Sequence, residues 1–219
     1  MEPFRILTGV AASFPQDDVD TDQILPTPYL RDMKADLSEG LFAYLRRTND
    51  GRRNTDFVLE QPAYTKARIL VVGRNFGCGS SREHAVWSVK AFGIGCVIAE
   101  SFAEVFRENC LRNGILPVVL PATEMAALHQ RVPLLEGAQP LTVDLQECVV
   151  IEPDGRRTAF EIAASERSAL LEGLDDTGLT LRQSASIDAW ERRMRTERPF
   201  MQITKPLATV PGPGDHQAS

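Results

Sequence analysis

Short apolar runs alternate with amphipathic stretches through the middle of the chain. Three β-branched runs, at 68–73, 95–100 and 115–120, are typical of buried strands. Between the first two, residues 83–92 place apolar side chains at helical spacing, and a second such stretch follows Ser101. This alternation of strands and helices predicts right-handed crossovers and a parallel sheet.

Serine and glutamate residues mark where these two helices start. Ser80 with Glu83, and Ser101 with Glu104, have the spacing of a capping box, in which each partner binds a backbone N–H of the first turn. Gly114 is suited to ending the second helix, because glycine adopts the left-handed conformation without strain. We expect both serines to be helix caps, and the pattern leaves open whether Ser80 also acts chemically.

Further strands and helices flank this core in sequence. A Pro153–Asp154–Gly155 turn separates two apolar runs and predicts a hairpin. The predicted strands outside the core are 4–12, 141–145, 148–151 and 158–162, and the predicted helices lie near 165–172 and 186–196. The predicted fold class is α/β, with a mixed, partly parallel sheet flanked by helices.

The length of 219 residues suits one domain or, at most, two small ones. We predict a single domain over residues 1–203. The segment Pro211–Gly214 and its neighbours contain almost no apolar side chains, so they cannot bury enough surface to offset the entropy of ordering them. Residues 204–219 are therefore predicted to form a disordered tail.

Composition and charge exclude several classes of protein. Hydrophobic residues make up 43% and charged residues 25%, as in ordinary globular proteins. The net charge of -6 disfavours a nucleic-acid binder, which normally carries a basic surface. No apolar run approaches the roughly 18 to 20 residues of a membrane helix. The apolar stretch 6–12, preceded by Glu2, is too short for a signal peptide, so we expect a cytoplasmic protein with no nucleic-acid or membrane partner.

The cysteines lie far apart in sequence, and none forms a CxxC pair. They are Cys78, Cys96, Cys110 and Cys148. This spacing does not match the usual zinc and iron–sulfur motifs, and disulfides are not expected without a secretion signal. We expect small buried cysteines and no metal bound by this chain.

The segment GRNFGCGSSREHA, residues 73–85, carries the clearest chemical signal. Glycines let a backbone approach a ligand closely, and the N–H groups at the start of the following helix favour an anion. Arg82 adds a planar, permanently charged group suited to a carboxylate or phosphate. The segment lacks the lysine of a P-loop, the third glycine of a dinucleotide loop and the GxSxG of a nucleophile elbow. We therefore expect a small carboxylate beside the serine hydroxyls.

Cysteine and histidine near this segment have simpler interpretations. Cys78 is a candidate thiolate nucleophile at a helix terminus, but no histidine partner is assignable from the sequence. His84 is interpreted as a packed or capping residue rather than a ligand. His129 and His216 have no evident polar partners in sequence.

Aspartates cluster near the N-terminus, at Asp17, Asp18, Asp20 and Asp22. The spacing from Asp18 is similar to a calcium loop, but Gln23 and Tyr29 stand where glycine and glutamate are required, so an EF-hand is excluded. Either a solvated acidic turn or a functional cluster fits the pattern. The stretch 24–34, with two prolines and two cations, predicts a semi-rigid surface loop able to reach over a ligand.

Together, GRNFGCGSSREHA and DDVDTDQILP resemble the small subunit of bacterial 3-isopropylmalate dehydratase. That family corresponds to the swivelling β/β/α domain of the aconitase superfamily. The resemblance runs from about residue 4 to residue 201 and includes the segments 56–64, 101–118, 173–181 and 187–191. It implies a hydro-lyase of leucine biosynthesis that interconverts 2-isopropylmalate and 3-isopropylmalate by dehydration and rehydration.

The resemblance also implies a partner and a cofactor. The partner is a large subunit, in a heterodimer or a higher assembly, and the substrate is a small dicarboxylate. A [4Fe–4S] cluster acts in this superfamily as a Lewis acid on the departing hydroxyl, and its ligands belong to the large subunit. This chain is therefore expected to bind no cofactor of its own, in agreement with its cysteine spacing.

Residue roles follow from the same resemblance. Ser80 matches the serine that removes the carbon-bound proton, while Ser81 and Arg82 match residues that hold a substrate carboxylate. An alkoxide needs N–H donors, a helix terminus and a cation to exist near neutral pH, and this loop offers all three. The loop backbone around these side chains is formed by Gly77, Cys78 and Gly79.

The acidic segment and the stretch after it match further family positions. Asp22 matches an active-site aspartate that is expected to orient partners across the subunit interface. The residues that match the substrate-recognition segment are Tyr29, Leu30 and Arg31. The chain departs from the family pattern at Pro28 and at residues 35–40, which read ADLSEG. A related alkylmalate hydro-lyase, of dimethylmalate or citraconate type, and a non-catalytic carboxylate-binding module are therefore the alternatives.

Overall fold

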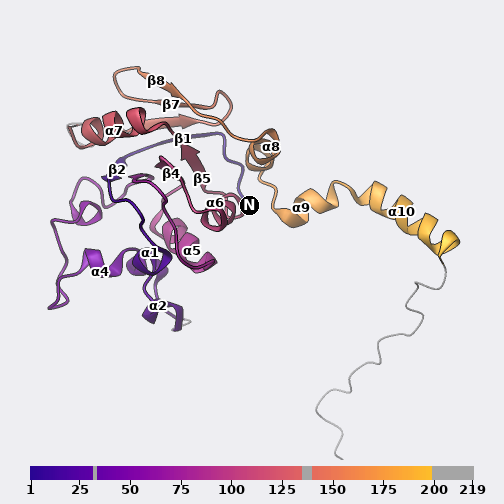
Figure 1. Cartoon of the computed structure of the whole chain (residues 1–219), viewed down its shortest axis with the longest axis horizontal. Coiled ribbons are helices and arrows are strands. Elements are labelled where there is room, and N and C mark those ends of the chain that lie inside the picture. Colours follow the sequence, from indigo (N-terminus) through magenta and orange to yellow (C-terminus); the bar gives the residue numbers. More distant parts are fainter. Residues whose placement is uncertain (32–33, 135–139, 199–219) are drawn as a thin grey trace, which may run out of the picture. The chain divides into compact units, whose positions relative to one another are not determined.

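The computed structural model describes residues 1–31, 34–134 and 140–198. The chain folds as two compact units, residues 1–177 and 178–219. The first unit contains both sheets, and the described part of the second is helical (Figure 1). The single domain over 1–203 stays a prediction, and the predicted disordered tail at 204–219 lies outside the described residues.

The structure confirms the predicted parallel core. Its strands, in spatial order, are β2 (Ala11–Phe14), β3 (Ile69–Val72), β4 (Cys96–Ala99) and β5 (Leu116–Val119), all parallel to their neighbours. The crossover helices are α5 (Glu83–Phe92), between β3 and β4, and α6 (Glu104–Arg112), between β4 and β5. This unit is the βαβαβ arrangement that the spacing of apolar runs predicts.

The predicted sheet is in fact two sheets, one parallel and one antiparallel. The antiparallel sheet contains, in spatial order, β1 (Ile6–Gly9), β6 (Leu141–Asp144), β7 (Val149–Ile151) and β8 (Arg157–Ala159). The α/β class is correct, and the predicted hairpin is confirmed as β7 and β8. The parallel and antiparallel strands thus form separate sheets instead of one mixed sheet.

The prediction of one strand over 4–12 is wrong, because the chain changes sheets at Val10. The carbonyl of Val10 accepts hydrogen bonds from the N–H groups of Arg68 (2.9 Å) and Ile69 (3.2 Å), which starts the parallel pairing. A Cβ on Gly9 would lie 2.6 Å from the Cβ of Arg68, so only glycine permits this close crossing. The sequence of a continuous apolar run does not show that its two halves pair with strands of different sheets.

The other helical segments lie mostly between β2 and β3 or after β5. They are α1 (Thr21–Ile24), α2 (Pro28–Arg31), α3 (Leu37–Gly40), α4 (Ala43–Arg46), η1 (Val58–Glu60), α7 (Ala122–Arg131), η2 (Val132–Leu134), α8 (Ala164–Glu172), α9 (Asp176–Leu181) and α10 (Ser184–Glu197). The predicted helices near 165–172 and 186–196 correspond to α8 and α10. No helix among the described residues is long and apolar enough to cross a membrane.

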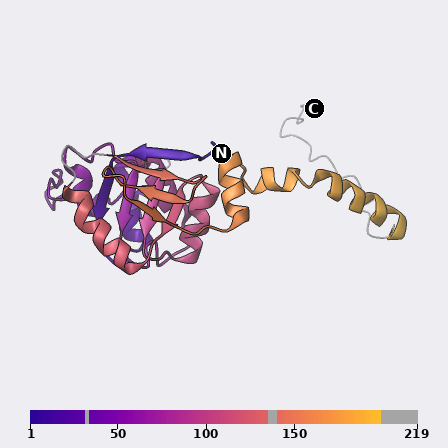
Figure 2. The same cartoon turned by 90° about the horizontal axis from the view of Figure 1, so that it is seen from above.

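The parallel sheet is the middle of three layers, so both of its faces are buried. Leu70 and Val72 pack into one apolar cluster with α1, α5 and α6, while Ile69 and Val71 pack into a second cluster with the antiparallel sheet, α7 and α8. Figure 2 shows the orange strands of the antiparallel sheet drawn over the parallel sheet. Alternate residues of each strand face opposite layers, which explains why these strands are apolar throughout.

Candidate active site

The glycine-rich loop and the acidic turn lie side by side at the carboxyl ends of β2 and β3. The N–H of Asp18 donates to the carbonyl of Arg74 (2.9 Å), and the N–H of Gly77 donates to that of Val19 (2.8 Å). The N–H of Thr21 donates in turn to the carbonyl of Cys78 (2.9 Å). The carboxyl ends of neighbouring parallel strands meet at one edge, where ligands of α/β sheets commonly bind.

Two of the aspartates hold the glycine-rich loop in place. Asp17 Oδ1 accepts from the N–H of Arg74 (2.7 Å), and Asp18 Oδ1 accepts from Asn75 Nδ2 (2.8 Å). Both Asp18 and Asn75 have positive φ, of 54° and 53°. Both side chains are exposed, as in a solvated acidic turn, and they also bind the neighbouring loop.

Asp20 has a different structural role, since it caps the short helix α1. Its Oδ1 accepts from the N–H of Gln23 (2.7 Å), and Gln23 Oε1 accepts from the N–H of Asp20 (3.4 Å). This capping box fixes the first turn, which carries Thr21 and Asp22. Capping boxes were predicted only at serines, so this one was missed.

Neither predicted serine caps a helix. α5 begins at Glu83 with Arg82 as its N-cap and no side-chain cap, and Glu83 Oε1 accepts from Asn113 Nδ2 (2.8 Å) instead. Ser80 and Ser81 thus precede the helix, and Arg82 stands at its N-cap.

The second capping box fails in the same way. α6 begins at Glu104 after Ala103, and Ser101 Oγ accepts from the N–H of Asn75 (2.9 Å). The Ser101 hydroxyl therefore supports the glycine-rich loop instead of the helix that follows it.

The hydroxyl of Ser80 meets the hydroxyl of Thr21, at 3.0 Å between the two oxygens. Thr21 Oγ1 also accepts from the N–H of Ser80 (3.2 Å), so its own proton is available to the Ser80 oxygen. Thr21 is 2% exposed, whereas Ser80 is exposed. Thr21 was not among the predicted site residues, although its place between Asp20 and Asp22 was a usable signal.

Arg82 binds Asp22, its neighbour across the two loops. Arg82 Nη1 donates to Asp22 Oδ1, and the Thr27 hydroxyl donates to the same oxygen (3.4 Å). Within the chain Asp22 pairs with Arg82, and its implied role across the subunit interface stays a prediction. Ser81 is exposed beside them and forms no hydrogen bond with the described part of the chain.

The predicted recognition residues lie on α2, which follows α1 closely (Figure 1). Tyr29 and Leu30 are half-buried and pack against the apolar cluster below, while Arg31 is exposed. The stretch expected to be a loop is therefore helical at 28–31. Ser80, Thr21, Asp22 and Arg82 form one contiguous site, and α2 borders it in sequence.

Two family models match the chain. Residues 1–123 match the aconitase C-terminal domain, and residues 176–203 match the C-terminal domain of the 3-isopropylmalate dehydratase small subunit. The 3-isopropylmalate dehydratase small subunit of Rhodospirillum rubrum is 48% identical over 206 residues, which cover 94% of this chain and 99% of the relative. This chain belongs to that family.

Other 3-isopropylmalate dehydratases are also similar to this chain. The small subunit of Rhizobium meliloti is 49% identical over 201 residues, covering 91% of this chain and 100% of the relative. A crystal structure of 3-isopropylmalate dehydratase from Methanocaldococcus jannaschii superposes with a TM-score of 0.61 at 29% identity, covering 84% of this chain and 99% of that one. The aconitase-type fold expected from the motifs is confirmed.

The cysteines of this family member are dispersed. Burial raises the pKa of both the Cys96 and Cys110 thiols, which are enclosed in the core. Partial burial, and then the Asp20 and Asp18 carboxylates, raise the pKa of the Cys78 thiol, which is the opposite of nucleophile activation. Across 1–31, 34–134 and 140–198, no group of three or more metal-ligating side chains is found.

Histidine positions differ from the sequence interpretation in one case. His84 is exposed, and its ring contacts that of Trp87 in a tilted arrangement, with 4.4 Å between the ring centroids. His129, expected to have no polar partner, lies 2.8 Å from the Ser13 hydroxyl and 3.2 Å from the carbonyl of Val72. His216 lies outside the described residues.

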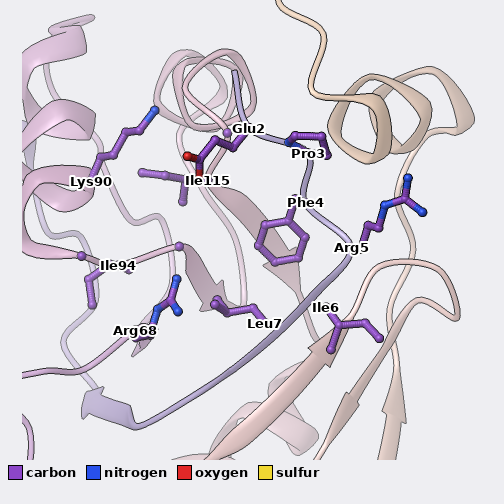
Figure 3. A pocket seen from close by; sticks show the side chains of 13 residues that line it. Glu2, Pro3, Phe4, Arg5, Ile6, Leu7, Arg68, Lys90, Ile94 and Ile115 are labelled. Atoms are coloured by element: carbon purple, nitrogen blue, oxygen red, sulfur yellow. The ribbon is translucent and has the colours of Figure 1, made fainter.

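A cavity of about 320 Å³ lies at the opposite, amino-terminal end of the parallel strands (Figure 3). Its lining includes Arg68, Gly95 and Ile115, which immediately precede β3, β4 and β5. None of the predicted site residues lines it. This cavity is therefore separate from the candidate site.

Proposed function

We propose that this chain is the small subunit of a 3-isopropylmalate dehydratase, a hydro-lyase that interconverts 2-isopropylmalate and 3-isopropylmalate. Membership of the family supports the reaction. One observation carries the assignment of the site: the Ser80 hydroxyl, 3.0 Å from the Thr21 hydroxyl, stands beside the Arg82–Asp22 pair.

Ser80 is the proposed base that removes the carbon-bound proton. A serine hydroxyl ionises with difficulty, so its alkoxide must be stabilised by donors that are in place before the reaction. Thr21 Oγ1 accepts the N–H of Ser80 and can direct its own proton to the Ser80 oxygen. Arg82 supplies a nearby positive charge. These groups lower the free energy of the charged state formed on proton transfer.

Arg82 is the proposed carboxylate clamp. Its guanidinium presents several N–H groups in one plane, and only Nη1 is engaged by Asp22. The Asp22 contact fixes the orientation of the side chain and leaves the other nitrogens for a substrate carboxylate. Ser81, exposed next to it, adds a hydroxyl donor.

A small subunit implies a large-subunit partner, and we propose that the partner supplies the rest of the pocket. A [4Fe–4S] cluster bound there would act as a Lewis acid on the departing hydroxyl. The dispersed cysteines of this chain, two of them enclosed in its core, do not form a cluster site, which supports placing the cluster on the partner. The proposed location of the assembly is the cytoplasm.

Residues 35–40 bear on the alkyl group that the substrate carries. The segment 35–40, which departs from the family pattern, contains α3 (Leu37–Gly40), and Gly40 packs against Tyr29. A related alkylmalate, of dimethylmalate or citraconate type, is therefore the second candidate substrate.

The test is reconstitution with the cognate large subunit. Wild-type complex should interconvert the isopropylmalates, and Ser80→Ala should lower kcat by about 10³-fold while the subunits still associate. Ser165→Ala, which removes an exposed hydroxyl on α8, should leave kcat unchanged. A near-normal kcat for Ser80→Ala contradicts the catalytic role, and tight dicarboxylate binding by the isolated chain favours a non-catalytic module.

A further inference from the structure

A buried ion pair lies beneath the proposed recognition segment. Arg46, on α4, is 5% exposed, and Glu60, on η1, is 8% exposed. Arg46 Nε donates to Glu60 Oε1 at 2.5 Å, and the guanidinium also lies over the ring of Phe92, 5.2 Å from its centroid. A buried ion pair offers little net stability over an apolar pair of similar size, so its presence suggests a role in fixing a conformation.

Arg46 holds the two backbone carbonyls at the ends of one turn, residues 38–41. Arg46 Nη1 donates to the carbonyls of Ser38 (2.7 Å) and Leu41 (3.2 Å). Arg53 Nη1 donates to the other oxygen of Glu60 (2.8 Å). Burial raises the pKa of Glu60, but the bonds from Arg53 and Arg46 outweigh it and lower that pKa, so the pair stays charged.

The turn held in this way is the one on which Tyr29 rests. A Cβ on Gly40 would lie 2.6 Å from Leu25 Cδ1 and 2.9 Å from Tyr29 Cδ1, so the ring contacts the bare backbone of α3. Gly40 is buried between the two anchored carbonyls. The position of the Tyr29 ring is therefore set by the position of this turn.

The same turn also contacts α1, the helix that carries Thr21 and Asp22. The N–H of Phe42 donates to the carbonyl of Ile24 (2.8 Å), the last residue of α1. The other end of α1 is held by the bond from the Thr21 N–H to Cys78. One anchored turn thus contacts both α1 and α2.

We propose that Arg46, Glu60 and Gly40 are positioning residues for alkyl-group recognition, because they set where Tyr29 stands relative to the site. This inference rests on the proposed function and concerns its substrate selectivity. None of the three residues touches the substrate. Displacing the turn should change how well an alkyl group fits against Tyr29, without removing the base or the carboxylate clamp.

The experiment compares two substrates on the reconstituted complex, 2-isopropylmalate and the smaller 2-methylmalate. Gly40→Ala introduces a methyl group that forces Tyr29 or Leu25 to move, and Arg46→Lys keeps the charge beside Glu60 but loses the planar fork. For both variants, kcat/KM for 2-isopropylmalate divided by kcat/KM for 2-methylmalate should fall at least fivefold. kcat on 2-methylmalate should stay within twofold of wild type.

Arg52→Lys is the matched control, because Arg52 pairs with Asp50 on the surface, with side chains 83% and 52% exposed. Its substrate ratio should equal that of wild type. Assembly is checked first by gel filtration, and Arg46→Lys, the milder change, carries the test if Gly40→Ala does not assemble. An unchanged ratio in an assembled variant, or an equal loss on both substrates, overturns the inference. A wild-type complex inactive on every alkylmalate overturns the proposed function instead.

Discussion

At the residue scale, the central feature of the site is a hydrogen bond between a buried hydroxyl, that of Thr21, and an exposed one, that of Ser80. Thr21 is enclosed, its N–H binds the carbonyl of Cys78, and its hydroxyl oxygen accepts from the N–H of Ser80, so this oxygen is held in place before any ligand binds. Ser80 is exposed and therefore able to meet a substrate. Preorganised donors of this kind stabilise charge that develops in a transition state without reorganising during the reaction.

Replacement of Thr21 by valine tests this arrangement. Thr21→Val keeps the shape but removes the hydrogen bond between the two hydroxyls and the acceptor for the Ser80 N–H. We expect kcat to fall by about 10²-fold with a small change in KM, because the lost bond matters mainly in the transition state. Steady-state kinetics of the reconstituted complex measure both constants.

A matched control exists on the antiparallel sheet. Thr8→Val removes an exposed bond between the Thr8 and Thr142 hydroxyls (2.9 Å) and should leave kcat unchanged. If Thr21→Val retained more than half of the wild-type kcat, Thr21 would have only a structural role.

At the element scale, the loop after β3 is shaped by contacts with elements distant in sequence. Gly77 has φ of 79°, and a Cβ there would lie 2.2 Å from Cγ of Phe106 on α6. The strut from Ser101 to Asn75 joins the same loop to the end of β4. The loop is thus fixed by the packing of α6 as well as by its own glycines.

Gly77→Ala should therefore destabilise the protein more than an ordinary glycine substitution. The left-handed conformation costs about 1–2 kcal/mol for alanine, and the contact with Phe106 adds roughly 1–3 kcal/mol of overpacking. Gly155→Ala, at a φ of 87° with no heavy atom within 4 Å, carries only the first cost. Urea unfolding of both variants measures the difference. Equal losses of unfolding free energy would show that Phe106 moves away from the added methyl group without cost.

The sequence pattern predicted the main elements of this region but not its capping. The helix α5 has the predicted bounds, Glu83–Phe92, because its apolar spacing is intrinsic to the segment. The serines at both predicted caps instead bond to residues of other segments, Ser80 to Thr21 and Ser101 to Asn75. A capping pattern shows only that a serine can bind a nearby backbone N–H. In the folded chain each serine lies closer to a partner from another segment.

At the scale of the whole first unit, charged contacts join elements of different layers. Arg107 on α6 binds Glu166 on α8 through two bonds, of 2.8 and 2.6 Å, and holds the pKa of that carboxyl below its usual value. His129 joins α7 to the parallel sheet through Ser13 and Val72. Because the Val72 carbonyl can only accept, Nε2 carries the proton and Nδ1 accepts from Ser13.

His129 should make stability depend on pH in the mildly acidic range. Burial lowers its pKa below the ordinary 6.5, although the bond to Val72 and the Asp17 carboxylate act in the opposite direction. The unfolded state therefore binds the proton more readily, and stability present above pH 6.5 is lost as pH falls through the lower folded pKa. The loss is limited because the ring is only half-buried.

Urea unfolding at pH 7 and pH 5 measures this dependence. His129→Gln should be less stable at pH 7 but should lose less stability between the two pH values than wild type. His84→Gln, at an exposed ring, should keep the wild-type dependence. An identical pH dependence in His129→Gln would assign the acid sensitivity to other groups.

The parallel core, the hairpin, the loop at 73–85 and the family could all be predicted from the order of amino acids, because they depend on apolar spacing and on residues adjacent in the chain. The folded chain was needed to see that the opening run serves two sheets, that Thr21 meets Ser80 and that Gly40 supports Tyr29. Each of these contacts joins segments whose distance in space is set by how the layers pack. The periodicity of a segment fixes its conformation and its apolar face, but its partner across the fold depends on every other segment.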